Sequence, residues 1–349
     1  MYRKSVKIAL VLVYLVIIAG AVVRMTGSGM GCPDWPKCFG YWIPPTEASA
    51  LAWQPNTEYE AGQVIIREES LQVASSDFIS GEAFAKANWE QYDKHDYAIF
   101  NPWHTWIEYI NRLLGALAGL VVLVMAVLSF SQWRLKRRIV YLSWLAVVMM
   151  GFQGWLGATV VYSVLAPVRI TIHMVMALLI VALLIYLLYT SRMQLLEASF
   201  SSGRLGTKYD RPFKYLVLLA LILTLIQIIM GTQVRQFVDE RIDQVGYAAK
   251  SLWLNDPEVV FYLHRSFSIL VLLLNLFLFM RNKKRALGYS LTNWVLLLLG
   301  LEILSGTVMY YFDFPFTTQP VHLIVAALLF GVQFYLLLET FPKRDAVKA

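Results

Sequence analysis

Three histidines lie within long apolar segments of this 349-residue sequence. His173, His264 and His322 each stand in the first two turns of a predicted helix. Ionisable residues in such segments are rare and are commonly functional, although a single histidine can also serve an interhelical hydrogen bond. Three histidines at similar depth therefore predict a shared kind of ligand.

An internal duplication relates two of these histidines. Residues 153–173 align without a gap on residues 302–322, so that His173 falls on His322. Self-similarity of this kind is the signature of a repeated structural unit. The two copies are therefore expected to present their imidazoles at equivalent places.

A second match between the copies reveals a difference. Residues 108–112 correspond to residues 261–265, and Asn111 then occupies the position of His264. One copy has two histidines and the other has one. We expect the two copies to bind related ligands in different ways.

One histidine on each of several helices favours a flat, wide ligand. A zinc site needs three or four ligand atoms that converge at about 2 Å, whereas heme takes axial imidazoles from two facing helices. The histidines therefore predict heme binding, with His264 and His322 as a complete axial pair.

Glu108 is an acidic residue about one turn into an apolar segment, three positions before Asn111 and on the same helical face. A carboxylate at this depth is suited to proton transfer. The structural alternative is a salt bridge to Arg112 or Arg169. Its repeat partner is Phe261, so the carboxylate belongs to one copy only.

Two arginines follow the paired positions directly. Arg112 follows Asn111, and Arg265 follows His264. A guanidinium group binds carboxylates well, so both arginines are candidates for contacts with heme propionates. The alternative is that both side chains extend to the membrane surface.

Cys32 and Cys38 are the only cysteines, and both fall in the first loop between apolar segments. If this loop faces an oxidising compartment, we expect the pair to form a disulfide. The disulfide could serve to stabilise the loop or to take part in redox chemistry, and the sequence leaves both roles open. The surrounding sequence is rich in glycine and proline, which is typical of a tightly folded loop.

The composition excludes a soluble globular protein, since 58% of the residues are hydrophobic, 15% are charged and the mean hydropathy is +0.57. Eight segments are long enough to span a bilayer as helices. They are 7–26, 104–129, 139–160, 168–190, 214–236, 258–280, 289–311 and 318–340. The sequence thus predicts an all-α integral membrane protein with two pseudo-twofold-related four-helix bundles and an enlarged first extracytoplasmic loop.

The domain organisation follows from the repeat. We expect an N-terminal half over 1–190, a cytoplasmic linker over 191–213 and a C-terminal half over 214–349. The loop at 27–102 exceeds its counterpart at 237–257 and is predicted to form a small cap with one or two strands. No catalytic motif is visible in this loop.

Basic residues concentrate in alternate loops, and by the positive-inside rule these loops and both termini are expected in the cytoplasm. The expected location is therefore the inner (cytoplasmic) membrane of a cell. The net charge of +7 follows from this topology. Because the basic residues are scattered, we expect no nucleic-acid partner, and membrane lipid is the expected surrounding. A homo-oligomer is compatible with the sequence.

These residues resemble the heme A synthase family, over roughly 1–26 and 103–340. The resemblance implies that His264 and His322 are axial ligands of heme b. It also implies that His173 belongs to a pocket for heme O, that Glu108 is catalytic and that Cys32 pairs with Cys38. The implied reaction oxidises a methyl group of heme O to the formyl group of heme A, and the implied partners are a heme O-producing farnesyltransferase and cytochrome oxidase assembly factors.

The sequence departs from the family at Asn111, where the family motif has histidine. Three explanations remain: the substrate iron is five-coordinate on His173, with water or oxygen on the other side; His104 replaces the missing ligand; or this half binds heme without reacting. We favour the first. A b-type heme electron carrier that exchanges electrons with quinone, and a heme chaperone or transporter, are the alternative functions.

Overall fold

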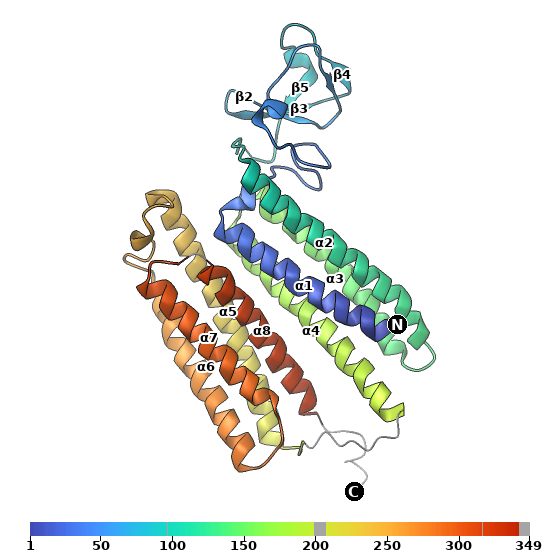
Figure 1. The fold of residues 1–349 in the computed structure, drawn as a ribbon, viewed down its shortest axis with the longest axis vertical. Helices are drawn as coiled ribbons and strands as arrows, with labels where there is room; N and C mark the ends of the chain where they lie inside the picture. The colour runs from blue at the N-terminus through green and yellow to red at the C-terminus, as the bar shows by residue number, and fades with distance from the viewer. Residues whose placement is uncertain (96, 199–206, 316, 342–349) are drawn as a thin grey trace. The chain divides into compact units, whose positions relative to one another are not determined.

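The computed structural model describes residues 1–95, 97–198, 207–315 and 317–341, and its described part is dominated by long helices (Figure 1). Eight of these helices are long and apolar enough to cross a membrane, which confirms the predicted number of spans. Their backbone groups are paired within each helix, as a lipid surrounding requires. The helices are α1 (Tyr2–Met25), α2 (Pro102–Leu128), α3 (Arg137–Tyr162), α4 (Pro167–Ala198), α5 (Arg211–Val245), α6 (Val259–Lys284), α7 (Leu291–Tyr311) and α8 (Thr318–Glu339).

Helix α5 continues well beyond the predicted end at 236, although the added sequence is charged. The extension is amphipathic: Val238 and Ile242, four residues apart, are buried in a cluster with Trp253 and Phe314. Packing of this one face keeps the chain helical after the apolar span has ended. At the other end of α5, the Asp210 side chain accepts a hydrogen bond from the backbone nitrogen of Phe213 at 2.7 Å and caps the helix.

The structure divides into two compact units. The helical unit comprises 1–14, 120–150 and 174–349, and the β-containing unit comprises 15–119 and 151–173. The predicted division into two halves at 191–213 stays a prediction from the repeat. Within that linker, residues 199–206 lie outside the described part of the chain.

Within the helical unit, helices α5 to α8 pack as a bundle in which α5 and α7 each contact both α6 and α8 (Figure 1). A buried hydrogen bond joins two of these helices, from the side-chain amide of Gln333 in α8 to the side-chain oxygen of Asn275 in α6 at 3.1 Å. Buried polar pairs of this kind fix the register of helices in a membrane.

The described residues of the β-containing unit form five short strands, where the sequence predicted one or two. Strands β2, β3 and β5 form an antiparallel sheet, and β1 pairs with β4. Their bounds are β1 (Glu58–Tyr59), β2 (Val64–Arg67), β3 (Ser70–Ala74), β4 (Phe78–Ile79) and β5 (Trp89–Gln91).

Alternation along the strands gives this sheet two apolar faces. Val64 and Leu71 lie in a buried cluster with both cysteines. Ile65 and Ala74 lie instead in a cluster with Trp89. One face of the sheet therefore supports the disulfide loop, and the other packs on aromatic side chains.

Candidate functional site

Two histidines face each other inside the helical unit. The ring centroids of His264, in α6, and His322, in α8, are 6.4 Å apart and the ring planes are inclined by 72°. Each ring lies against a glycine of a neighbouring helix. A Cβ atom placed on Gly231 would be 3.1 Å from Cε1 of His264, and one placed on Gly306 would be 3.5 Å from Cε1 of His322.

This spacing fits two axial ligands of one heme iron. An imidazole nitrogen coordinates a metal at about 2 Å, which separates the centroids of two opposed rings by about 6 Å. In addition, Nδ1 of His264 is buried without a hydrogen-bond partner. An orphaned ring nitrogen is expected where a metal is to be bound, because buried polar atoms are otherwise satisfied.

The Nδ1 atom of His322 has two polar neighbours. Its Nδ1 lies 2.8 Å from the hydroxyl of Ser305 and 3.1 Å from Oε2 of Glu302, both in α7. Neither residue was predicted from the sequence as part of a ligand site. Glu302 and Ser305 are three residues apart and so share one face of their helix, next to a helix that carries a histidine. This spacing was the signal in the sequence that could have predicted the contact.

His173, in α4, belongs to the β-containing unit. Its ring has surroundings similar to those of His322, but a neutral amide takes the place of the carboxylate. The side-chain amide of Gln153 lies 3.3 Å from Nε2 of the ring and donates to the backbone oxygen of His173 at 3.0 Å. A Cβ atom on Gly157 would be 3.4 Å from Cε1 of the ring. Nδ1 of His173 is buried without a partner. The equivalent glycines, Gly157 and Gly306, thus contact equivalent imidazoles.

Glu108 is buried in the same unit, with 4% of its surface exposed. One carboxylate oxygen forms an ion pair with Arg112 at 2.5 Å, and the other accepts a hydrogen bond from the backbone nitrogen of Cys32 at 2.9 Å. Arg112 is thus the salt-bridge partner that the sequence offered. Arg169, the other candidate, donates to the backbone oxygen of Thr159 instead.

Arg112 also holds the disulfide loop. Its guanidinium group donates to the backbone oxygens of Asp34 at 2.6 Å, Lys37 at 2.9 Å and Cys32 at 3.1 Å. The Asp34 carboxylate accepts from the backbone nitrogens of Phe39 and Gly40. Burial raises the pKa of the Asp34 carboxyl group, while these hydrogen bonds and Arg112 oppose the rise. Asp34 was not predicted, because only the folded loop brings it to Arg112.

Cys32 and Cys38 form a disulfide, with a sulfur–sulfur distance of 2.02 Å. The predicted pairing is therefore confirmed. Both cysteines are fully buried, and Cys32 contributes its backbone nitrogen to the Glu108 carboxylate. The disulfide loop and the candidate catalytic residue consequently form one hydrogen-bonded cluster.

The remaining candidates lie around these clusters. The side-chain oxygen of Asn111 is buried without a hydrogen-bond partner. His104 is half-buried, and its backbone packs so closely on Gly31 that a Cβ there would collide with it. Arg265 is exposed and lies near the rings of Phe261 and Tyr262.

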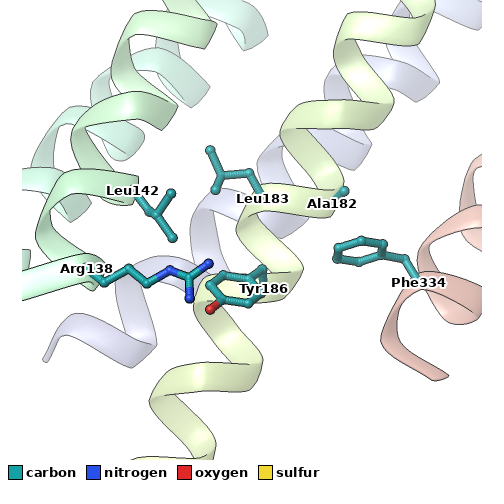
Figure 2. A pocket seen from close by; sticks show the side chains of 6 residues that line it. All are labelled: Arg138, Leu142, Ala182, Leu183, Tyr186 and Phe334. Atoms are coloured by element: carbon teal, nitrogen blue, oxygen red, sulfur yellow. The ribbon is translucent and has the colours of Figure 1, made fainter. Parts of the chain in front are cut away.

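A pocket in the helical unit contains none of these candidates. Figure 2 shows Arg138 beside the ring of Tyr186, with the guanidinium carbon 5.3 Å from the ring centroid. The other lining residues are apolar, and they are Leu142, Ala182, Leu183 and Phe334. The candidate chemistry therefore resides in the two histidine clusters and the Glu108 cluster.

The apolar helices and facing imidazoles define a multi-pass α-helical membrane protein with ligand arrangements suited to heme. Residues 4–334 match the COX15-CtaA family, described as cytochrome oxidase assembly protein, and the chain belongs to this family.

Relatives from several bacteria share the length of the chain. The heme A synthase of Alkalihalophilus pseudofirmus is 23% identical, over 93% of this chain and 92% of its own. That of Wolbachia pipientis wMel is 25% identical, over 94% and 89%. That of Flavobacterium johnsoniae is 23% identical, over 94% of both chains. The similarity thus covers both histidine clusters and the Glu108 cluster.

Proposed function

We propose that this protein converts heme O to heme A by oxidising a methyl group of the heme to a formyl group. The relatives that share its length are heme A synthases. The observation that carries the proposal is the contrast between a facing imidazole pair in one half and a single imidazole with a buried carboxylate in the other. One half is suited to hold a cofactor and the other to act on a substrate.

The C-terminal half binds heme b through His264 and His322. Their 6.4 Å spacing and the unpaired Nδ1 of His264 support this assignment. Arg265 is the candidate for a contact with a propionate group, and its exposed guanidinium is available for it. When bound, heme b supplies one-electron transfer. The protein holds the two imidazoles in place, each against a glycine of a neighbouring helix.

The N-terminal half binds heme O, with His173 as the ligand of the substrate iron. Asn111 is a poor iron ligand, so we infer that the opposite position is left open. His104 is the alternative ligand. The terminal nitrogens of Arg112 donate to the Glu108 carboxylate and to three backbone oxygens of the disulfide loop, so we infer that only its Nε–H is left for a propionate.

Glu108 is the proposed catalytic carboxylate. Conversion of a methyl to a formyl group removes electrons and protons and adds one oxygen atom, so it requires an external electron acceptor together with groups that accept protons or orient water. The Oε2 atom of Glu108 accepts a hydrogen bond from the Cys32 backbone nitrogen, and a carboxylate oxygen can accept more than one hydrogen bond. Arg112 holds the other oxygen and keeps the carboxylate in one orientation.

The cellular setting is proposed from the charge pattern. Both termini lie in the cytoplasm, the protein spans the cytoplasmic membrane, and the strands at 58–91 belong to an extracytoplasmic cap. A farnesyltransferase that makes heme O would supply the substrate. Cytochrome oxidase assembly factors would receive the product.

Extraction and chromatography of the bound hemes test this function. Purified wild-type protein should contain heme b together with heme O or heme A. His264→Ala should lose heme b, and His173→Ala should lose the prenylated heme. Membranes from a strain that lacks the gene should contain no heme A. If heme A persists there, and no second copy of the gene exists, the proposed function is wrong.

A further inference from the structure

We propose that Glu302 is a positioning residue that fixes His322 as an iron ligand and stabilises the oxidised form of the heme at the His264–His322 site. The inference rests on the proposed heme b site. It assigns a role to a buried carboxylate that the oxidation of heme O does not use.

Two side chains of α7 contact the same nitrogen of the His322 ring. Oε2 of Glu302 lies 3.1 Å from Nδ1, and the Ser305 hydroxyl lies 2.8 Å from the same atom. With Nδ1 engaged, Nε2 is the nitrogen left for iron. Histidines that bind metals commonly donate their other ring N–H to a carboxylate, which fixes the tautomer and makes the ligand a stronger donor.

Among the described residues, the Glu302 carboxyl group is buried without a positively charged side chain beside it. Only 14% of the Glu302 side chain is exposed, and its Oε1 atom has no hydrogen-bond partner. Within the described part of the chain, no lysine or arginine forms a salt bridge with Glu302. A buried carboxylate is costly without a compensating positive charge. Oxidised heme iron with two neutral imidazoles carries a net positive charge at its centre, and reduction removes it.

The side chains beside the equivalent histidines differ between the two halves. Glu302 corresponds to Gln153 in the repeat, and Ser305 corresponds to Leu156. Gln153 contacts the ring of His173 but carries no charge. The repeat therefore places a carboxylate beside one imidazole and a neutral amide beside its equivalent. This difference would lower the reduction potential of the C-terminal heme selectively.

The test is a reductive titration of the purified protein, followed by the b-type absorbance. Glu302→Gln keeps the size of the side chain but replaces the carboxylate beside Nδ1 of His322 with a neutral amide, so the midpoint potential should shift upward. Ser305→Ala keeps the carboxylate and should give a smaller shift. Gln153→Glu, the matched variant in the other half, should leave the b-type midpoint at the wild-type value.

An unchanged midpoint in Glu302→Gln would overturn the inference while leaving the heme b site intact. Failure of the site itself is recognised separately, since the wild-type b-type absorbance would then persist in His264→Ala. If Glu302→Gln does not retain heme, Glu302→Asp takes its place. Aspartate retains the carboxyl group, so its midpoint should stay near the wild-type value, and a shift larger than that of Ser305→Ala would overturn the inference.

Discussion

The backbone nitrogen of Cys32 donates a hydrogen bond to the Glu108 carboxylate at 2.9 Å. This contact joins the disulfide loop to helix α2 across a long stretch of sequence. The position of the candidate catalytic carboxylate therefore depends on the folded loop as well as on its own helix. The Arg112 guanidinium, which bonds to both, closes the cluster.

Glu108→Gln should lower heme A production by about 100-fold or more, which is the usual contribution of a positioned acid or base. Glutamine can still accept the hydrogen bond from Cys32, so the loop and the heme b content should be retained. The heme A to heme O ratio in membranes measures the effect. Glu90→Gln, which changes an exposed carboxylate, is the control. Equal ratios in the two variants would exclude a catalytic role for Glu108.

Arg112→Gln should destabilise the protein by about 3 kcal/mol or more, because it leaves a buried carboxylate unpaired. The Arg112 and Glu108 side chains are only 12% and 5% exposed. The control is Arg67→Gln, which removes a partly exposed ion pair with Glu68 and a cation–π contact with Phe84, and should cost less, about 1 kcal/mol. Denaturant unfolding in detergent compares them. Similar stabilities would show that the buried ion pair contributes little.

Gly231→Ala should weaken heme b binding by about tenfold, as expected when an axial imidazole is displaced. The added Cβ would lie 3.1 Å from the His264 ring, which must then move. Gly306→Ala is the matched variant, because its Cβ would lie 3.5 Å from the His322 ring, at an ordinary contact distance. The heme content of the two purified variants distinguishes them. Equal retention would show that the His264 ring has room to shift.

Asn111→His restores the ligand that the repeat lacks. If the substrate iron is five-coordinate on His173, the new imidazole should convert it to a six-coordinate, low-spin form and slow the reaction. The absorption spectrum and the heme A yield measure the two effects.

His104→Ala separates this explanation from the alternative ligand. Prenylated heme should remain bound in the purified variant, since His104 is not expected to contact the iron. Loss of that heme, with heme b retained, would instead identify His104 as the second axial ligand.

The sequence alone determined the eight spans and the equivalence of the two copies. A run of about 20 apolar residues has one stable backbone solution in lipid, so the helices follow from composition. The repeat predicted that His173 and His322 occupy equivalent positions, because copies of one structural unit fold alike. The end of α5 was missed, because it is decided by the packing of Val238 and Ile242 against Trp253 and Phe314, which lie in the loops after α5 and α7.

The tertiary structure decided what each polar side chain contacts. The sequence offered two salt-bridge partners for Glu108, and only the fold selected Arg112. The contacts of Asp34 with Arg112, and of Glu302 with His322, join residues from separate segments. Hydrogen bonds depend on distances of a few tenths of an ångström and on direction. Helical periodicity predicts which face a residue occupies, but only the packing of one element on another brings two such atoms within bonding distance.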